Sequence, residues 1–344
     1  MSQIDVSAYK EHLSGFNVTD CAVRDKNIFY FVAREDYTKW PTAKWDRENE
    51  PPPDEHEIIK RIVVWMRHKE KINQWSASEL TGFTRLGAGI SIQPKPQFVG
   101  VSLDGQVYSI GSGEHGVESN FRSFDEGGPS RGGIRKLRTI DGWLYFCGGN
   151  NSVGKRLGKN EWFSHSHAIP DPKRTDHRHN TFDDIDGFGE QDIYCVGQEG
   201  QVYHYDGKTW KHVPFPSNID LETVCCAGDG NVYISGKKGM TFKGRGNRWK
   251  SIIKDGAYLP FRDMVWYEDR VWCTSDYGVW TIKDDKLASA DLPDGMSAYA
   301  GNLSTADGVL LLAGYGGAAF LEKGKWTKIF SVAEMSRQVS PGVK

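Results

Sequence analysis

A short unit, a turn followed by an apolar strand that runs into glycine, recurs along this chain and limits how the chain can fold. Residues 228–236, "GDGNVYISG", show the unit in full. Related units differ in detail but keep the strand and the small residue at its end. The units end 37, 49, 39, 39 and 39 residues apart, at Gly111, Gly148, Gly197, Gly236, Ser275 and Gly314.

A period near 40 residues in a strand-rich sequence is typical of a β-propeller, in which each repeat forms one four-stranded blade. The fourth strands share a tryptophan near their start, as in "NEWFSHS" and "KTWKHVP", which we expect to cover the seam between blades. The sequence therefore predicts an all-β protein that is a single β-propeller over residues 1–332, with a tail at 333–344. We expect seven blades, with six or eight as alternatives, at about 17–78, 92–123, 133–166, 180–214, 221–253, 260–290 and 297–332.

Two local features bear on this prediction. Asp-Gly pairs stand at 104–105, 141–142, 229–230 and 307–308, where glycine accepts the positive φ of a tight hairpin. They lack the alternating Asp/Asn ligand series of a calcium loop, so we interpret them as turns. The last repeat supplies four strands of its own, although the amino-terminal "QIDVSAY" could still pair at a sheet edge.

Composition narrows the classes of partner. The 43 basic and 45 acidic residues give a net charge of −2, without a basic patch for nucleic acid or an anionic membrane. No signal peptide or long apolar stretch is visible, so we expect a cytoplasmic protein with neither partner. The six cysteines lack metal-site spacing and are expected to be buried apolar side chains in a reducing compartment, and we expect no cofactor.

Two segments resemble the BNR-like and Ycf48-like propellers. Residues 275–280, "SDYGVW", are similar to a compressed Asp-box, and residues 197–210, "GQEGQVYHYDGKTW", resemble the wider repeat of that group. The resemblance implies the fold. Some members are sialidases, but their arginine cluster, tyrosine nucleophile and acid match no positions here. Others are binding proteins, including immunity proteins that bind bacterial toxins, and no motif in this sequence identifies that subgroup.

Three long segments interrupt the repeats. Residues 35–57 lie within the first blade, residues 123–132 join the second blade to the third, and residues 166–180 join the third to the fourth. In an up-and-down blade all three connections fall at the same end. Loops on a rigid scaffold commonly carry binding residues, so we expect this end to be the functional face.

The first segment, residues 35–57, is called the acidic loop below. It has eight acidic and three basic side chains, a net charge of −5, and three aromatic residues. This composition favours binding of a basic protein partner. The alternative is a solvated insertion whose tryptophans fold back onto the propeller. The candidate contact residues are Tyr37, Trp40, Trp45, Asp46, Glu48 and Glu50.

The third segment is rich in histidine and arginine. Its candidate contact residues are Arg174, His177, Arg178 and His179. With His165 and His167, the histidines could form a zinc or nickel site, but the nearby cations would repel a metal ion, so we expect exposed loop histidines and no metal. Phosphate or carboxylate binding by the arginines and Lys173 is a further alternative.

No catalytic motif is present: the sequence has no GxSxG, HExxH or phosphate-binding glycine loop. The carboxylates of residues 182–192, "FDDIDGFGEQD", could serve a glycosidase, although they also suit a turn. We therefore predict a non-catalytic propeller that binds one protein through the long-loop face, as an immunity protein does when it covers a toxin's active site. The alternative is a propeller glycoside hydrolase or lyase with its site at the ring axis.

Overall fold

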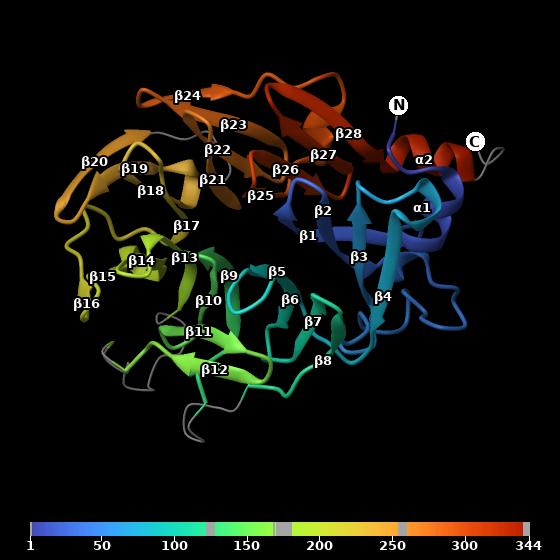
Figure 1. The fold of residues 1–344 in the computed structure, drawn as a ribbon, viewed down its shortest axis with the longest axis horizontal. Coiled ribbons are helices and arrows are strands. Elements are labelled where there is room, and N and C mark those ends of the chain that lie inside the picture. Colours follow the sequence, from blue (N-terminus) through green and yellow to red (C-terminus); the bar gives the residue numbers. More distant parts are fainter. Residues whose placement is uncertain (1, 122–127, 168, 170–180, 254–259, 340–344) are drawn as a thin grey trace. The chain divides into compact units, whose positions relative to one another are not determined.

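The computed structural model is almost entirely β-sheet (Figure 1). It describes all residues except 1, 122–127, 168, 170–180, 254–259 and 340–344. The chain forms two compact units, residues 1–88 with 291–344 and residues 89–290. Each unit is described by itself below.

Seven four-stranded antiparallel sheets make up the fold, and within each sheet consecutive strands are neighbours. These are the blades of a seven-bladed β-propeller, as the sequence predicts. The strands are β1 (Phe16–Asp25), β2 (Ile28–Glu35), β3 (Lys60–Met66), β4 (Trp75–Leu80), β5 (Leu86–Ser91), β6 (Gln97–Ser102), β7 (Val107–Gly111), β8 (Glu114–Val117), β9 (Ile134–Ile140), β10 (Trp143–Gly148), β11 (Ser152–Gly158), β12 (Glu161–Ser164), β13 (Phe182–Gly189), β14 (Asp192–Gly197), β15 (Val202–Tyr205), β16 (Trp210–His212), β17 (Leu221–Cys226), β18 (Val232–Gly236), β19 (Thr241–Arg245), β20 (Arg248–Ile253), β21 (Asp263–Tyr267), β22 (Arg270–Ser275), β23 (Gly278–Lys283), β24 (Lys286–Ser289), β25 (Asn302–Ala306), β26 (Val309–Gly314), β27 (Gly317–Glu322) and β28 (Lys325–Ser331).

Helical segments are few and short, and no helix among the described residues is long and apolar enough to cross a membrane. They are the α-helices α1 (Val6–His12) and α2 (Val332–Val339) and the 3₁₀ helices η1 (Tyr37–Lys39), η2 (Lys71–Asn73), η4 (Gln198–Gly200), η5 (Lys237–Gly239) and η6 (Met296–Tyr299).

The unit formed by the two ends of the chain contains sheets β1–β4 and β25–β28. Their first strands pack together, and the backbone N–H of Val23 on β1 donates to Ser304 Oγ on β25 at 3.0 Å. One apolar core runs through both sheets and includes Phe29, Trp65 and Phe320. The first and last blades of the chain are thus joined by side-chain packing, without exchange of a strand.

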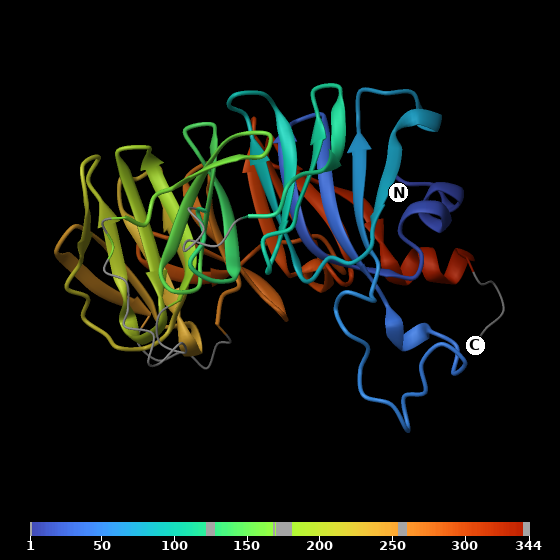
Figure 2. The ribbon, with the colours of Figure 1, turned by 90° about the horizontal axis from the view of Figure 1, so that it is seen from below.

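Helices α1 and α2 lie side by side against this unit (Figures 1 and 2). The sequence allowed residues 3–9 to pair at a sheet edge, but Asp5 caps a helix there by accepting the N–H of Ala8 at 2.8 Å. Tyr9 and Leu13, four residues apart, are both buried in the core. Residues after 332, placed in a tail by the sequence, continue as α2 as far as Val339, and its Met335 is buried.

In the second unit, residues 89–290, an Asp-Gly pair forms a tight turn, and the tryptophans at the start of two fourth strands pack against neighbouring residues. Asp141 and Gly142 both have positive φ, 52° and 81°, as a tight β-hairpin requires. Trp162, at the start of β12, packs on Phe121 with ring centroids 4.5 Å apart, and Trp210, at the start of β16, is buried. The proposed seam-covering role of these tryptophans is consistent with this packing.

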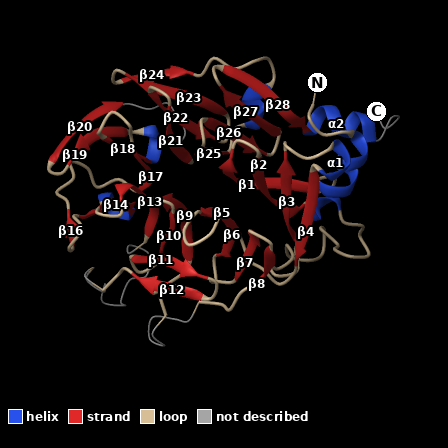
Figure 3. Ribbon diagram, viewed as in Figure 1, coloured by secondary structure: helices blue, strands red, loops and turns tan. Residues whose placement is uncertain are grey.

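One repeat has a different place from its relatives. In the sequence, "DGQVYSIG" resembles units such as "DGNVYISG", whose strand is β18, the second strand of its sheet. In the structure "VYSIG" is β7, the third strand of its sheet, because β6 (Gln97–Ser102) precedes it. The local sequence thus predicted the strand but not its position in the sheet. Strands are the dominant element of the structure (Figure 3).

Candidate partner-binding site

The acidic loop is a folded extension of the sheet β1–β4. Glu35 is the last residue of β2, and its backbone N–H donates to Ile59 O at 2.9 Å just before β3 begins. The N–H of Asp36 donates to Gly15 O at 2.8 Å. Figure 2 shows the segment extending away from the strands of its own sheet. Its base is therefore closed by the backbone, while its outer part is available for contact.

Three side chains fix the returning arm of the loop. Arg34 donates to Glu55 with Nη2–Oε1 at 2.6 Å and Nε–Oε1 at 3.1 Å. The ammonium of Lys60, a fully buried residue, lies 3.2 Å from Glu55 Oε2 and donates to Ile58 O at 2.8 Å. Burial opposes ionisation of Glu55, but the bonds from Arg34 and Lys60 outweigh it and lower the pKa of Glu55. The role of Arg34 and Lys60 was not predicted from the sequence, although the two cations flank the acidic loop, Arg34 directly before it and Lys60 shortly after it.

The aromatic residues brace the loop from inside. The rings of Tyr37 and Trp45 are 5.0 Å apart and those of Tyr37 and Trp40 are 6.3 Å apart, both edge to face. Lys44 Nζ lies 3.3 Å above the Trp40 ring, and Trp45 Nε1 donates to Pro51 O at 2.9 Å. All three aromatic side chains are half-buried. They neither project freely nor enter the core of the sheet, and they give the loop a rigid centre.

The predicted acidic contact residues come together in one turn. Asp46 accepts the side-chain amide of Asn49 at 2.8 Å and the N–H of Glu48 at 3.1 Å, and these bonds lower the pKa of Asp46. The N–H of Asp46 in turn donates to Glu50 Oε2 at 3.2 Å. Glu48 and Glu57 are exposed and form no ion pair within the described chain. The loop thus displays carboxylates that its own cations do not neutralise, Glu48 in its outer part and Glu57 near its base.

Lys60 is expected to control how firmly the loop is held. Lys60→Met removes the donors to Ile58 and Glu55, and a hydrogen bond to a charged group contributes about 1.5–3 kcal/mol. We expect proteolytic cleavage within residues 36–57 to be on the order of tenfold faster, while the circular dichroism spectrum is unchanged. Lys71→Met, at an exposed position, serves as the control. Equal cleavage rates in the two variants would contradict the anchoring role.

The candidate residues of the third segment, Arg174, His177, Arg178 and His179, lie outside the described residues. Within the described part, His165 is buried and accepts from Trp210, with Nε1 3.1 Å from Nδ1 and 3.0 Å from the carbonyl oxygen of His165. Burial, followed by the charge of His167, lowers the pKa of His165. His165 therefore has a structural contact. No group of three or more His, Cys, Asp or Glu side chains that could hold a metal is found in the residues that the structure describes.

Three of the carboxylates considered for a glycosidase, Asp183, Asp184 and Asp186, lie on β13, a first strand, whereas Glu190 lies in the turn that follows and Asp192 begins β14. Asp184 accepts from Arg138 Nη2 at 3.1 Å, from Thr223 Oγ1 at 2.8 Å and from the Val224 N–H at 3.0 Å. Asp186 accepts the Cys226 N–H at 2.7 Å, and its burial raises its pKa to about 6. Both aspartates tie β13 to β17 of the next sheet, which is a structural role.

Asp183, directly before Asp184 in the sequence, is the extra residue of a β-bulge in β13, because Phe182 pairs with Gly197 and Asp184 with Val196. It is half-buried, and its pKa is raised to about 7 by burial and by the negative charge of Glu222 on β17. The pKa of Glu222 is itself raised, by burial and then by Asp220. Neither the bulge at Asp183 nor its proximity to Glu222 has a visible signal in the local sequence.

Comparison with known proteins separates family from fold. No known family profile matches the sequence. The chain is 31% identical over 245 residues to the immune protein Tsi7 of Pseudomonas aeruginosa, a match that covers 71% of this chain and 79% of that protein.

Solved structures with a similar fold share little sequence with the chain. The WD40 β-propeller domain of Doa1 has a TM-score of 0.55 and 11% identity, with 91% of this chain and 95% of that chain covered. Sqt1 of Saccharomyces cerevisiae has a TM-score of 0.56 and 9% identity, with 92% and 86% covered. These two comparisons support the propeller fold alone.

Proposed function

The chain belongs to the family of the immune protein Tsi7, and from this premise we propose that it is an immunity protein that binds one toxin protein and neutralises it. The observation that carries the proposal is the sequence relationship, which extends over most of both chains. A propeller suits this role because it offers a rigid scaffold for long binding loops. We further propose that neutralisation takes place in the cytoplasm, and the six cysteines, which we interpret as reduced apolar side chains, support this proposal.

We propose that the acidic loop is the main contact with the toxin. Support comes from its fixed base, its braced aromatic centre and its unpaired carboxylates, because a preordered loop loses little conformational entropy on binding. The excess of negative charge favours a basic surface on the toxin and speeds encounter. The contact residues would be Tyr37, Trp40, Trp45, Asp46, Glu48 and Glu50, and, from the other segment, Arg174, His177, Arg178 and His179.

The kinship with BNR-like and Ycf48-like propellers stays a prediction within this proposal. It rests on the resemblance of residues 275–280 and 197–210 to the repeats of that group. The immunity function does not depend on it.

The function is tested by capture followed by a growth assay. A protein retained by the full chain from a lysate of its native host is identified and expressed alone in a sensitive strain, where we expect growth arrest. Coexpression of the chain should restore growth. A captured protein that is harmless alone, or whose toxicity persists on coexpression, would contradict the immunity function.

The contact surface is tested by charge reversal at exposed positions of the acidic loop. The variant Glu48→Lys/Glu50→Lys/Glu57→Lys leaves the Arg34–Glu55–Lys60 anchor intact, and we expect toxin affinity to fall by about 10- to 100-fold, mainly through slower association at low salt. The control Glu161→Lys/Asp291→Lys/Asp294→Lys makes the same charge change at exposed positions outside the loop. Equal losses in the two variants would show that only net charge matters and would remove the loop from the proposal.

A further inference from the structure

The last strand of the sheet β17–β20 has an unusual side chain pattern. β20 (Arg248–Ile253) pairs with β19 on one side and with no strand on the other in the described part of the chain. In the register of this pair, Lys243 lies opposite Lys250 and Arg245 lies opposite Arg248. Residues directly opposite in an antiparallel pair share a face, so four cations occupy one face of two strands.

Like charges placed opposite one another destabilise a sheet, and ion pairs with nearby aspartates offset part of this cost. Lys243 Nζ lies 3.0 Å from Asp229 and 3.2 Å from Asp285, and Lys250 also pairs with Asp285. Arg245 pairs with Asp192. Asp229 and Asp285 lie in turns, and Asp192 is the first residue of β14.

Arg248 has no such compensation. It is exposed, and no carboxylate, hydrogen-bond acceptor or aromatic ring contacts its guanidinium among the described residues. Five N–H donors are therefore available on Arg248, and the exposed ammonium of Lys250 retains donors beyond its single carboxylate partner. The outermost strand thus carries the least neutralised cations of the group.

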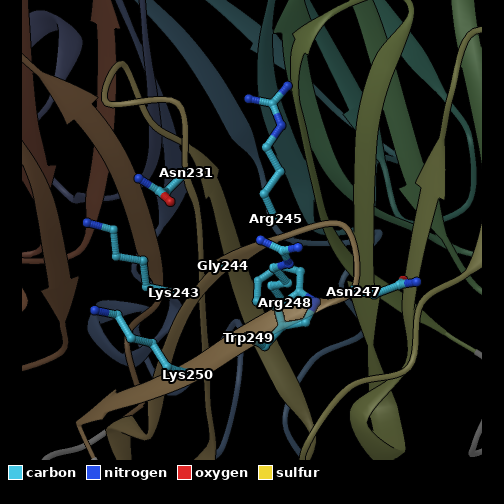
Figure 4. A pocket seen from close by; sticks show the side chains of 8 residues that line it. All are labelled: Asn231, Lys243, Gly244, Arg245, Asn247, Arg248, Trp249 and Lys250. Atoms are coloured by element: carbon cyan, nitrogen blue, oxygen red, sulfur yellow. The ribbon is translucent and has the colours of Figure 1, made fainter.

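The cations line an open depression together with Asn231, Asn247 and Trp249. Figure 4 shows Lys243 and Lys250 extending alongside one another, with Arg248 beside Trp249. Gly244 lets the Trp249 ring pack closely, because a Cβ at Gly244 would come within 2.8 Å of that ring. Trp249 Nε1 donates to Gly246 O at 2.7 Å, which fixes the indole in place. Trp249 thus holds in place the strand that carries Arg248 and Lys250.

We propose that β20 is a second interaction surface, where an extended acidic segment of a protein partner adds as a further antiparallel strand. The free edge of β20 supplies backbone donors and acceptors. Acidic residues at alternate positions of the added strand lie opposite Arg248 and Lys250, which are two residues apart on the same face. Phosphates of a nucleic acid could accept from the cations and from backbone N–H groups but cannot donate to the carbonyl groups of the edge, so the edge favours a peptide.

Charged side chains on an edge strand also prevent unwanted pairing between sheets, and this simpler role needs only repulsion. Protection and recognition differ in one measurable respect. An edge that is only protected rejects every strand, whereas a recognition edge accepts an acidic strand and rejects a basic or neutral one.

The test uses the full chain and fluorescently labelled synthetic peptides in an anisotropy titration. The first probe alternates threonine and glutamate, and the second replaces each threonine with proline, which keeps the charge but removes backbone donors. We expect the first probe to bind at least about tenfold more tightly than the second. Equal binding would overturn strand addition, and tighter binding of an oligothymidylate of equal charge would overturn the peptide as occupant.

Matched variants locate the binding. Arg248→Ser/Lys250→Ser should weaken binding of the threonine–glutamate probe by about tenfold or more. Lys69→Ser/Lys71→Ser removes two exposed lysines from the other unit and should leave binding unchanged. Circular dichroism spectra establish that both variants are folded. An unchanged affinity in the first variant, or an equal loss in the second, would contradict the assignment to β20.

Discussion

Replacing Arg156 by methionine should lower the free energy of unfolding by about 3–5 kcal/mol, the range found when one partner of a buried ion pair is removed. Arg156 on β11 is 1% exposed, and the Glu118 side chain is completely buried. Two bonds join them, Nη1–Oε2 and Nη2–Oε1, both 2.7 Å long. Without Arg156, the carboxylate of Glu118 would remain buried without its cation. It would still accept the backbone N–H of Asn160, at 2.9 Å.

The pairing also sets the charge state of Glu118. Burial opposes ionisation of its carboxyl, but bonds from Arg156, Asn160 and Ser109 overcome this effect and lower the pKa of Glu118. After Arg156→Met, this pKa should rise, so part of the lost stability should return as the pH is lowered and Glu118 becomes protonated. Urea unfolding at two pH values measures both effects.

A second variant separates pairing from packing. Arg156→Met/Glu118→Met removes both charges, and buried ion pairs replaced by apolar side chains are often neutral in stability, so we expect most of the loss to be recovered. If the double variant is as unstable as Arg156→Met, packing of the arginine side chain near Trp162 is responsible and the ion pair is not. A loss below about 1 kcal/mol in the single variant would also contradict the expectation.

Local sequence patterns predicted much of the fold because turns and strands depend on neighbouring residues. The Asp-Gly pair at 141–142 has the backbone angles that its composition indicates. The strand "VYSIG" was also predicted, but its position in the sheet was wrong, because in this sheet the Asp-Gly turn joins the second strand, β6, to the third and not the first strand to the second. The helix α1 was missed because burial of Tyr9 and Leu13 against the last sheet stabilises it, and that contact joins the two ends of the sequence.

In the candidate site too, features that depend on neighbouring residues could be predicted, whereas contacts between distant residues could not. Charge and aromatic content marked the acidic loop, and residues near in sequence, such as Asp46 and Glu50, meet in the structure. The anchor between Arg34 and Glu55 depends on how the loop returns to β3, which composition does not specify. Likewise, the carboxylates of residues 182–192 look alike in sequence, but a β-bulge at Asp183 and the contacts of Asp184 with β17 give these two residues different environments.

Replacing Asp183 by asparagine should stabilise the protein at pH 8 and have little effect near pH 4. The pKa of Asp183 is about 7 in the folded chain, compared with about 4 for an unfolded aspartate. Between these values the folded state holds a proton that the unfolded state has lost, so stability falls as the pH rises from 4 to 7. Three pKa units correspond to about 4 kcal/mol, and partial exposure reduces this to about 2–4 kcal/mol.

Thermal unfolding midpoints of the wild type and Asp183→Asn across pH 4–8 should therefore separate as the pH increases. Glu48→Gln removes the same charge at the exposed loop tip and should give a curve parallel to that of the wild type. Glu222→Gln removes the negative charge that raises the pKa of Asp183, so the fall in stability should move to lower pH. A destabilising effect of Asp183→Asn at every pH would mean that the carboxylate makes a required contact, and would refute the electrostatic explanation. A gain in stability of Asp183→Asn that increases with pH would identify Asp183 and Glu222 as neighbouring carboxylates whose repulsion the fold tolerates at neutral pH.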